Sequence, residues 1–444
     1  MYTLYVYLQG IHLVAFNKLH PSMATLEHIH SNPIRPEIQD GNVEWVTSST
    51  VRPVERLPLI FWVDGNQWDE VNLWALDKAR AKDVKLKTIN TLMEHLHKYA
   101  EWLEREKIDW RHFPTSKAER VLVRFRGFLI SLRDNGDLSP STASARMSAV
   151  IQFYRYANAH NLICHGSKMW EDKSVAIRYF DPAGFKRTIQ RITTDISIPN
   201  RARQGFRLED GLLPITSDHQ SQLLNFTKEN VSDELHLMLL IGFYTGARLS
   251  TITTMRKSSL EQAYPDPQNN GFWLVPIGPG TGISTKFDVS GELIIHASLM
   301  ESLRAYATSS QHIERAIKAA PKNKLFLFLT RHCNPYTTKA VGREMVNLRR
   351  KGMLAGLKFL TKFKFHQTRA TYGTWLMSFL LSSENISLKA AIEFVKRAMH
   401  HKHESTTFRY ITFIEHTKVK IKMANEFTNA FFGLTNTLSE KKEV

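Results

Sequence analysis

The segment that most constrains the fold is a strongly apolar stretch, SDELHLMLLIGFYTGARLSTITTM, which begins at Ser232. Ser232 and the two acidic residues after it form the pattern of a helix N-cap followed by a first turn that complements the helix dipole. The apolar residues that follow predict a buried helix. Arg248 lies beside this apolar run, which taken by itself suggests either a structural ion pair or a functional cation.

The sequence around this helix predicts a second globular unit, which we expect to span residues 210–433. Thr216 or Ser217 is placed to cap its first helix. The runs GFWLVPIG and GELIIHA predict two strands on either side of a glycine-rich turn, whereas HQTRATYGTWLMSFLL and SLKAAIEFVKRAMHH predict helices. We therefore expect a mainly α fold with a small β-sheet (α+β), followed by a polar tail at 434–444.

Residues 84–165 have the periodicity of helices. Apolar residues recur there at three- and four-residue steps, as one face of a helix requires. They are Ile89, Leu92, Leu96, Tyr99 and Leu103. We expect a small helical domain here, preceded at 1–83 by an extension of unknown role.

The last helix of that domain is predicted to carry a basic face. Ser139 is a candidate N-cap, with Pro140 at the first helical position. Arg146 and Arg155 follow on the same helix. Their aromatic neighbours are Phe153, Tyr154 and Tyr156. This face is a candidate DNA-binding surface, and a solvated charged face on an ordinary bundle is the alternative.

Residues 166–209 are basic and interrupted by prolines. We interpret them as a linker that lies along a polyanion, with Lys186 and Arg187 as further candidate DNA contacts. The whole chain of 444 residues has 59 Lys and Arg against 42 Asp and Glu, a net charge of +17. Such a balance favours a nucleic acid partner, because each contacted phosphate releases condensed counterions. A basic membrane-surface enzyme is the alternative.

Two cysteines and the hydropathy pattern set the expected compartment. Cys164 and Cys333 are far apart and have no CxxC spacing, so neither a disulfide framework nor a thiolate zinc site is expected. No apolar run approaches the roughly 18 residues of a membrane span. We expect a cytoplasmic protein of two or three domains that is associated with the nucleoid when it binds DNA.

Three short motifs occur in a fixed order in the second unit: TGARLS with Arg248, HQTR with His366 and Arg369, and HHKHESTTFRY with His401 and Tyr410. Together they resemble the tyrosine recombinase (phage-integrase) family, a family of site-specific integrases. The resemblance covers residues 210–433 and extends more weakly to 84–165, which is similar to the family's helical core-binding (SAM-like) domain.

One further residue is a candidate for the site besides the five motif residues, and a few positions depart from the family's usual pattern. Lys286, in STKFDV, stands where the family carries a lysine on a β-hairpin, although its distance from Arg248 is long for the family. Thr251 and Ala370 replace residues that are common beside the two arginines. His400 stands where a glycine commonly ends the helix.

The resemblance implies a complete mechanism. Tyr410 attacks a DNA phosphodiester to form a 3′-phosphotyrosyl bond, and Arg248 and Arg369 hold the non-bridging oxygens. His366 and His401 hydrogen-bond the scissile phosphate. Lys286 protonates the departing 5′-oxygen. No metal ion, cofactor or ATP is required.

The resemblance also implies an assembly, in which a homo-tetramer holds two double-stranded DNA sites. The C-terminal segment 415–433 is expected to pack on a neighbouring protomer, and accessory proteins are possible further partners. A type IB topoisomerase and a catalytically silent DNA-binding protein of the same fold are the alternatives. A zinc or nickel site at His400, His401 and His403 is not expected, because HExxH spacing and cysteine partners are lacking.

Overall fold

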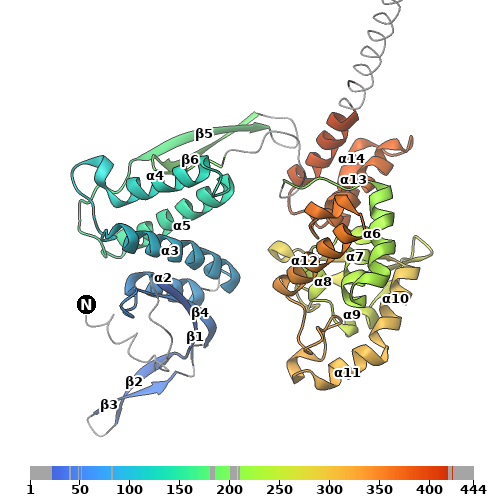
Figure 1. Cartoon of the computed structure of the whole chain (residues 1–444), viewed down its shortest axis with the longest axis horizontal. Helices are drawn as coiled ribbons and strands as arrows, with labels where there is room; N and C mark the ends of the chain where they lie inside the picture. The colour runs from blue at the N-terminus through green and yellow to red at the C-terminus, as the bar shows by residue number, and fades with distance from the viewer. Residues whose placement is uncertain are drawn as a thin grey trace, which may run out of the picture. The chain divides into compact units, whose positions relative to one another are not determined.

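The computed structural model divides the chain into two units, Met1–Ala202 and Arg203–Val444. The residues that it describes are 23–39, 42–48, 50–51, 53–81, 84–180, 186–200, 208, 211–418 and 423. Both units are mainly helical over these residues, with small antiparallel sheets, so the expected fold class is confirmed (Figure 1).

The first unit joins two short sheets to a set of helices and ends in a hairpin. Its elements are β1 (Thr25–Ser31), β2 (Ile34–Gln39), β3 (Asn42–Thr47), β4 (Val54–Phe61), α2 (Asp69–Arg80), α3 (Leu86–Glu106), η1 (Lys117–Glu119), α4 (Val121–Asp134), α5 (Pro140–Ala159), β5 (Asp172–Phe180) and β6 (Lys186–Thr194). β1 pairs with β4, β2 with β3 and β5 with β6, all antiparallel.

One aromatic core connects the segments of this unit. Trp68, just before α2, is buried, and its ring centroid lies 6.1 Å from that of Tyr99 on α3 and 5.6 Å from that of Phe153 on α5. Asn72 of α2 fixes the sheet to the helices, because its buried amide accepts a hydrogen bond from the Ile60 amide at 2.8 Å and donates one to the Ile60 carbonyl at 3.0 Å.

The expected division into an extension, a helical domain and a linker differs from this arrangement. One hydrophobic core contains Ala24, residues of β4 and Ile198 together with the central helices, so residues before 84 and after 165 bury side chains with those helices. The expected linker contains the β5–β6 hairpin. Short strands have weak local signals, and their partners are decided by burial.

The expected basic face on α5 is only partly present. Phe153 and Tyr154 are fully buried in the core, where the Tyr154 hydroxyl lies 2.7 Å from that of Tyr99. Arg146 is half-buried. Arg155 is exposed, with a guanidinium nitrogen 3.8 Å from a carboxylate oxygen of Asp172.

Lys186 and Arg187 lie at the start of β6, with side chains outside the described part of the structure. Their role in DNA binding, like that of Arg146 and Arg155, stays a prediction.

The second unit packs helices around one three-stranded sheet. Its elements are α6 (Ser217–Asn230), α7 (Asp233–Thr245), α8 (Leu249–Thr253), α9 (Lys257–Glu261), β7 (Tyr264–Pro265), β8 (Phe272–Ile277), η3 (Lys286–Asp288), β9 (Gly291–His296), α10 (Ala297–Ala307), α11 (Ser310–Lys318), η4 (Pro321–Asn323), α12 (Thr338–Leu354), η5 (Lys358–Lys362), α13 (Gln367–Ser382) and α14 (Leu388–Ala398). A further helical segment covers residues 404–418.

The apolar helix that the sequence predicts is α7, and it lies at the centre of this unit. It contacts α6, α8, α10, α13 and β9. Ser232 caps it by accepting a hydrogen bond from the Leu235 amide at 3.3 Å. Thr216 and Ser139 cap α6 and α5 in the same way. These N-terminal signals are local, which is why the sequence predicts them well.

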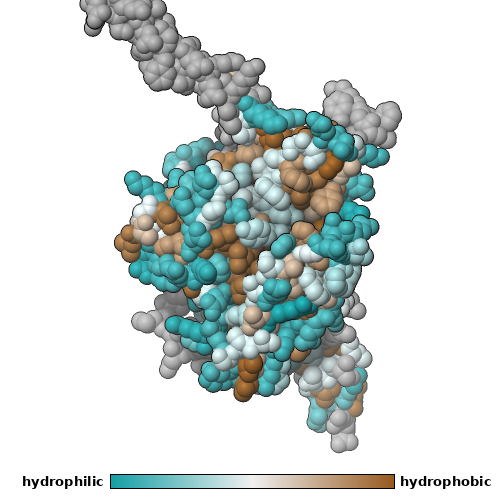
Figure 2. Space-filling model, turned by 90° about the vertical axis from the view of Figure 1, so that its right-hand side faces the viewer, coloured by the Kyte–Doolittle hydropathy of each residue, from teal (hydrophilic) through white to brown (hydrophobic). Residues whose placement is uncertain are grey.

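The face of the molecule drawn in Figure 2 mixes hydrophilic and hydrophobic patches. In the part of the chain that the structure describes, no helix is both long and apolar enough to cross a membrane. Beyond residue 418, the C-terminal segment 415–433 lies outside the described residues except for Met423.

The shared core of the first unit makes a testable prediction. Replacing Trp68 with alanine should destabilise that unit by about 3–5 kcal/mol, the usual cost of removing a large buried aromatic side chain. Trp45→Ala is the matched control, because Trp45 is 46% exposed on β3 and exposed substitutions usually change stability by less than about 0.5 kcal/mol. Urea unfolding followed by circular dichroism measures both. Equal effects would contradict the shared core.

Candidate active site

Arg369 lies where two helices end. Its Nη1 donates a hydrogen bond to the Gly246 carbonyl and its Nη2 donates one to the Met399 carbonyl, each at 2.6 Å. Gly246 is the C-cap of α7 and Met399 that of α14. Carbonyls at helix C-termini lack intrahelical partners and carry partial negative charge. They therefore stabilise a guanidinium that is only 1% exposed.

Arg248 approaches the same segment from the other end of the TGARLS motif. It is half-buried at the N-cap of α8, and its Nη1 lies 3.5 Å from the His400 carbonyl. The two arginines thus contact the consecutive carbonyls of Met399 and His400. The structure brings together two motif arginines that are 121 residues apart in the sequence.

Close packing of α7 against α13 makes this geometry possible. Gly246 has a φ of +65°, and a Cβ there would lie 2.4 Å from Cδ1 of Tyr372. At Gly242 a Cβ would lie 2.5 Å from Oγ1 of Thr368. Both glycines let α13 approach α7 closely enough for Arg369 to reach the end of that helix. Burial raises the pKa of Tyr372 to about 12, against the opposing effect of the Arg369 charge.

His401 and Tyr410 lie close together inside the unit. Nδ1 of His401 is 2.9 Å from Oγ1 of Thr407, and the rings of His401 and Tyr410 stack with their centroids 6.0 Å apart. Tyr410 is 0% exposed. Its ring packs against Gly373 of α13, where a Cβ would lie 2.5 Å from Cε1 of Tyr410.

His366 is the N-cap residue of α13, three positions before Arg369, and its side chain makes no capping hydrogen bond. Two neighbours instead fix this end of the helix. Gln367 donates to the Leu213 carbonyl at 2.9 Å, and the Thr371 hydroxyl accepts from the Ile215 amide at 3.1 Å.

Lys286 lies in a tight turn between β8 and β9. Phe287 and Asp288 both have positive φ, at +65° and +53°, and the Thr285 hydroxyl donates to the Val289 carbonyl at 2.7 Å. The Phe287 ring centroid lies 5.2 Å from Nζ of Lys286 and 5.5 Å from Nζ of Lys402. The Phe287 ring therefore lies near both Lys286 and Lys402, and Lys402 belongs to the segment that carries His401.

His400 occupies the position where the sequence comparison expects glycine. It has a φ of +51°, the left-handed conformation that ends α14, and its Nε2 lies 3.1 Å from the Glu292 carbonyl of β9. Burial lowers the pKa of its imidazole to about 4, and the charges of Arg369 and Arg248 contribute in the same direction. The neutral ring is therefore the form present at physiological pH.

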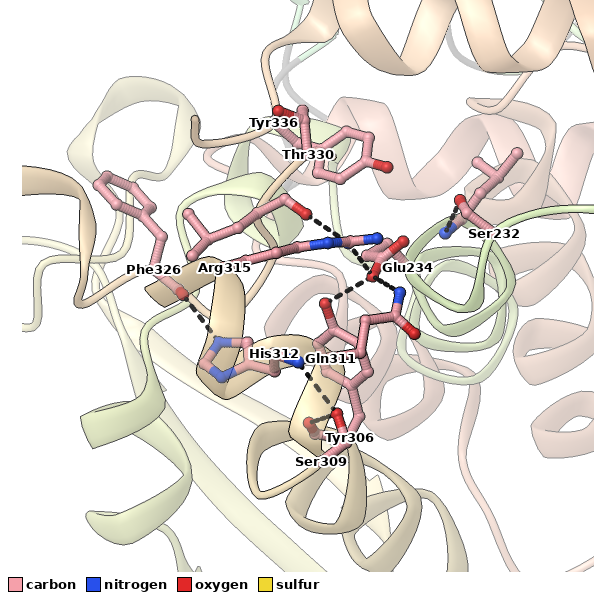
Figure 3. A network of polar contacts seen from close by, with 12 residues as sticks. Ser232, Glu234, Tyr306, Ser309, Gln311, His312, Arg315, Phe326, Thr330 and Tyr336 are labelled. Atoms are coloured by element: carbon pink, nitrogen blue, oxygen red, sulfur yellow. Dashed lines mark hydrogen bonds and ion pairs between the residues drawn. The ribbon is translucent and has the colours of Figure 1, made fainter. Parts of the chain in front are cut away.

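A buried carboxylate, which sequence reasoning did not single out, anchors the other end of α7. Glu234 is 0% exposed and accepts hydrogen bonds from Tyr306 at 2.8 Å and Gln311 at 3.1 Å, and from Arg315 (Figure 3). Arg315 also donates to the Leu329 carbonyl at 2.9 Å. The sequence signal for Glu234 was its place in the acidic first turn of α7. That signal predicted an interaction with the helix dipole rather than this hydrogen-bond network.

Gly246 supplies a stability prediction. Gly246→Ala should destabilise the second unit by more than the roughly 1–2 kcal/mol of a left-handed alanine, because the added Cβ also overlaps Tyr372. Gly342→Ala on α12 is the control, since a Cβ there meets open space and alanine favours a helix by about 1 kcal/mol. Thermal unfolding compares the two variants. A neutral Gly246→Ala would contradict the close packing of α7 on α13.

His400 supplies a pH prediction. The ordinary histidine pKa of 6.5 in the unfolded chain falls to about 4 in the folded one, so between these values the unfolded state binds more protons. The free energy of unfolding should therefore fall as the pH decreases from 6.5 to 4. The variant His400→Asn keeps a residue type that tolerates positive φ. Between pH 7 and pH 4.5 its free energy of unfolding should fall by about 2 kcal/mol less than that of the original chain.

Urea unfolding of both proteins at the two pH values measures this difference. Carboxylates that titrate in the same range are common to both proteins and cancel. An identical loss of stability in the two would show that His400 does not contribute.

Comparison with known protein families assigns one stretch of the sequence. Residues 214–415 match the phage integrase family. No curated protein sequence matches the chain.

Several solved structures are similar in fold. A Tn1549 transposon integrase fragment in complex with transposon right end DNA is 14% identical, covering 80% of this chain and 99% of that one, with a TM-score of 0.49. A second substituted variant of that fragment, in complex with circular intermediate DNA, is 15% identical, covering 77% of this chain and 94% of that one, with a TM-score of 0.48. A lambda integrase dimer bound to a COC′ core site is 14% identical, covering 76% of this chain and 93% of that one, with a TM-score of 0.45.

The assignment rests on the sequence match, because the structural likenesses are distant. The matched residues contain the whole candidate site, from Arg248 to Tyr410. The resemblance expected from the three motifs is confirmed. Over residues 214–415 this chain carries a phage integrase family domain, the domain of the tyrosine recombinases.

Proposed function

We propose that this chain is a site-specific recombinase that cleaves and rejoins duplex DNA through a 3′-phosphotyrosyl intermediate. The observation that supports it most is the convergence at residues 399–401. Arg369 and Arg248 contact the carbonyls of Met399 and His400, and His401 stacks on Tyr410. The residue types match what phosphoryl transfer to a phenol needs.

In the proposed reaction the Tyr410 oxygen attacks the phosphorus atom, so that a tyrosyl O–P bond forms while the bond from phosphorus to the 5′-oxygen breaks. The phenolic proton leaves with the help of His366, and Lys286 donates a proton to the 5′-oxygen. Arg248 and Arg369 stabilise the additional negative charge of the phosphorane. This fixed positive charge takes the place of a metal ion.

Rejoining is the reverse reaction, in which the 5′-hydroxyl of a strand attacks the phosphotyrosyl bond and releases Tyr410. The energy of the original phosphodiester is kept in that bond, so ATP is not required. Because Tyr410 is fully buried, the proposal requires the helical segment 404–418 to shift when DNA binds, so that the hydroxyl reaches the phosphate.

The proposed partner is double-stranded DNA, held by a tetramer on two sites. The net charge of +17 supports a polyanionic partner. Exposed apolar side chains on α13 support assembly, since Trp375 and Phe379 are 61% and 55% exposed and their rings stack 5.8 Å apart. In this proposal the C-terminal segment 415–433 packs on a neighbouring protomer.

A covalent-capture experiment tests the nucleophile. A pool of nicked duplexes with randomised sequence, incubated with the protein and treated with detergent, should yield covalent protein–DNA adducts that identify a cleavable site. Tyr410→Phe should form no adduct on that duplex, because the nucleophilic oxygen is gone. Tyr244→Phe is the control and should form it normally, since Tyr244 is a half-exposed residue of α7.

Three outcomes would contradict this proposal. Adduct formation by Tyr410→Phe would assign the nucleophile to another residue. The lack of any adduct with the original chain, with DNA binding intact, would favour the catalytically silent alternative. Relaxation of supercoiled DNA by single protomers without sequence preference would favour a type IB topoisomerase.

A further inference from the structure

The conformation of His400 is unfavourable for its residue type. Its φ of +51° lies in the left-handed region, which costs an L-residue other than glycine about 1–2 kcal/mol. The backbone of residues 400 and 401 nevertheless ends α14 regularly: the His400 amide donates to the Arg397 carbonyl at 3.1 Å and the His401 amide to the Lys396 carbonyl at 3.0 Å. A glycine would make this turn without strain, so the imidazole must compensate through its own contacts.

The imidazole is fitted against the first residues of β9. Its Nε2 lies 3.1 Å from the Glu292 carbonyl, which only accepts hydrogen bonds, so Nε2 carries the hydrogen. At Gly291 a Cβ would lie 2.5 Å from Cδ2 and 2.7 Å from Nε2 of His400. The ring therefore occupies the space that any larger residue at position 291 would need.

A second contact joins the same two segments. Lys402, two residues after His400, places its Nζ 5.5 Å from the Phe287 ring centroid, and Lys286 places its own Nζ 5.2 Å from the same centroid. The turn that carries Lys286 and the strand β9 that follows it are thus both held by residues 400–402. On its other side this segment contacts the arginines, through the carbonyls of Met399 and His400.

We propose that His400 is a positioning residue, whose ring fixes β9 and the Lys286 turn relative to Arg248 and Arg369. This inference rests on the proposed function, in which the ammonium group of Lys286 loses a proton to the 5′-oxygen as the P–O bond breaks and the bond to Tyr410 forms. His400 itself touches neither the proton nor the phosphate in this scheme. It acts through the backbone of β9.

The role predicts that His400 matters only when the leaving group needs a proton. A duplex with sulfur in place of the bridging 5′-oxygen releases a thiolate, which leaves without protonation. The test therefore measures the rate of covalent adduct formation on two forms of the duplex recovered by capture, one with the bridging oxygen and one with the bridging sulfur.

His400→Gly should form the adduct about 10- to 100-fold more slowly than the original chain on the oxygen duplex, the usual effect of misplacing a catalytic group by about 1 Å. On the sulfur duplex its rate should be close to that of the original chain. Lys286→Ala should show the same pattern. His403→Gly, which removes an exposed imidazole from the same segment, is the control and should match the original chain on both duplexes.

A double mutant tests the contact itself. Gly291→Ala should slow cleavage of the oxygen duplex, because its Cβ displaces the His400 ring. Combined with His400→Gly, it should cause no further loss, since both changes remove one contact. Glycine at position 400 relieves the backbone strain, so His400→Gly should fold, and its melting temperature checks this.

Three results would overturn the positioning role. Equal slowing of His400→Gly on the oxygen and sulfur duplexes would place its effect on the arginines or on folding. The lack of slowing on the oxygen duplex would show that the ring has no role. Additive losses in the double mutant would show that Gly291 and His400 act separately.

Failure of the proposed function is distinguishable from these results. If Lys286→Ala is not rescued by the sulfur duplex, Lys286 is not the proton donor. If Tyr410→Phe still forms the adduct, the nucleophile is wrong. Neither outcome depends on His400.

Discussion

The burial of the Arg369 guanidinium is the constraint on which the second unit depends. A charge removed from water is costly unless hydrogen bonds and opposite partial charges replace its hydration. Here the carbonyls of Gly246 and Met399 do so, each at the C-terminus of a helix. The guanidinium therefore fixes the ends of α7 and α14 against α13. The same contacts that satisfy the buried charge also bring Arg248 and His401 to one place.

Two further side chains, besides the two arginines, stabilise this arrangement. The buried carboxylate of Glu234 holds the N-terminal end of α7 to α10 and α11. His400 holds the end of α14 to β9. One network thus fixes the start of the central helix, while the other fixes the segment that the arginines contact. Neither is visible as a motif, because the partners are backbone carbonyls or residues about 70 to 110 positions away.

The first unit shows where sequence reasoning reached its limit. The helical stripe of α3 was predicted, and Ile89, Leu96, Tyr99 and Leu103 are buried while Leu92 is half-buried. The strands β1 and β4 were not predicted as part of the same core. Their apolar runs are short, and they are buried only when the two strands pair and pack against the helices. Aromatic residues assigned to a basic face, such as Phe153, belong to that core instead.

The sequence by itself determined the helices, their N-caps at Ser139, Thr216 and Ser232, and the family to which residues 214–415 belong. These depend on local hydrogen bonds and on the order of a few residue types, which a linear pattern contains. Only the tertiary structure decided that Arg369 is held by two helix ends, that His400 tolerates a left-handed turn, and that residues before 84 share the first core. Each depends on groups far apart in the chain, whose proximity arises only when folding makes burial of a charge or an apolar surface favourable.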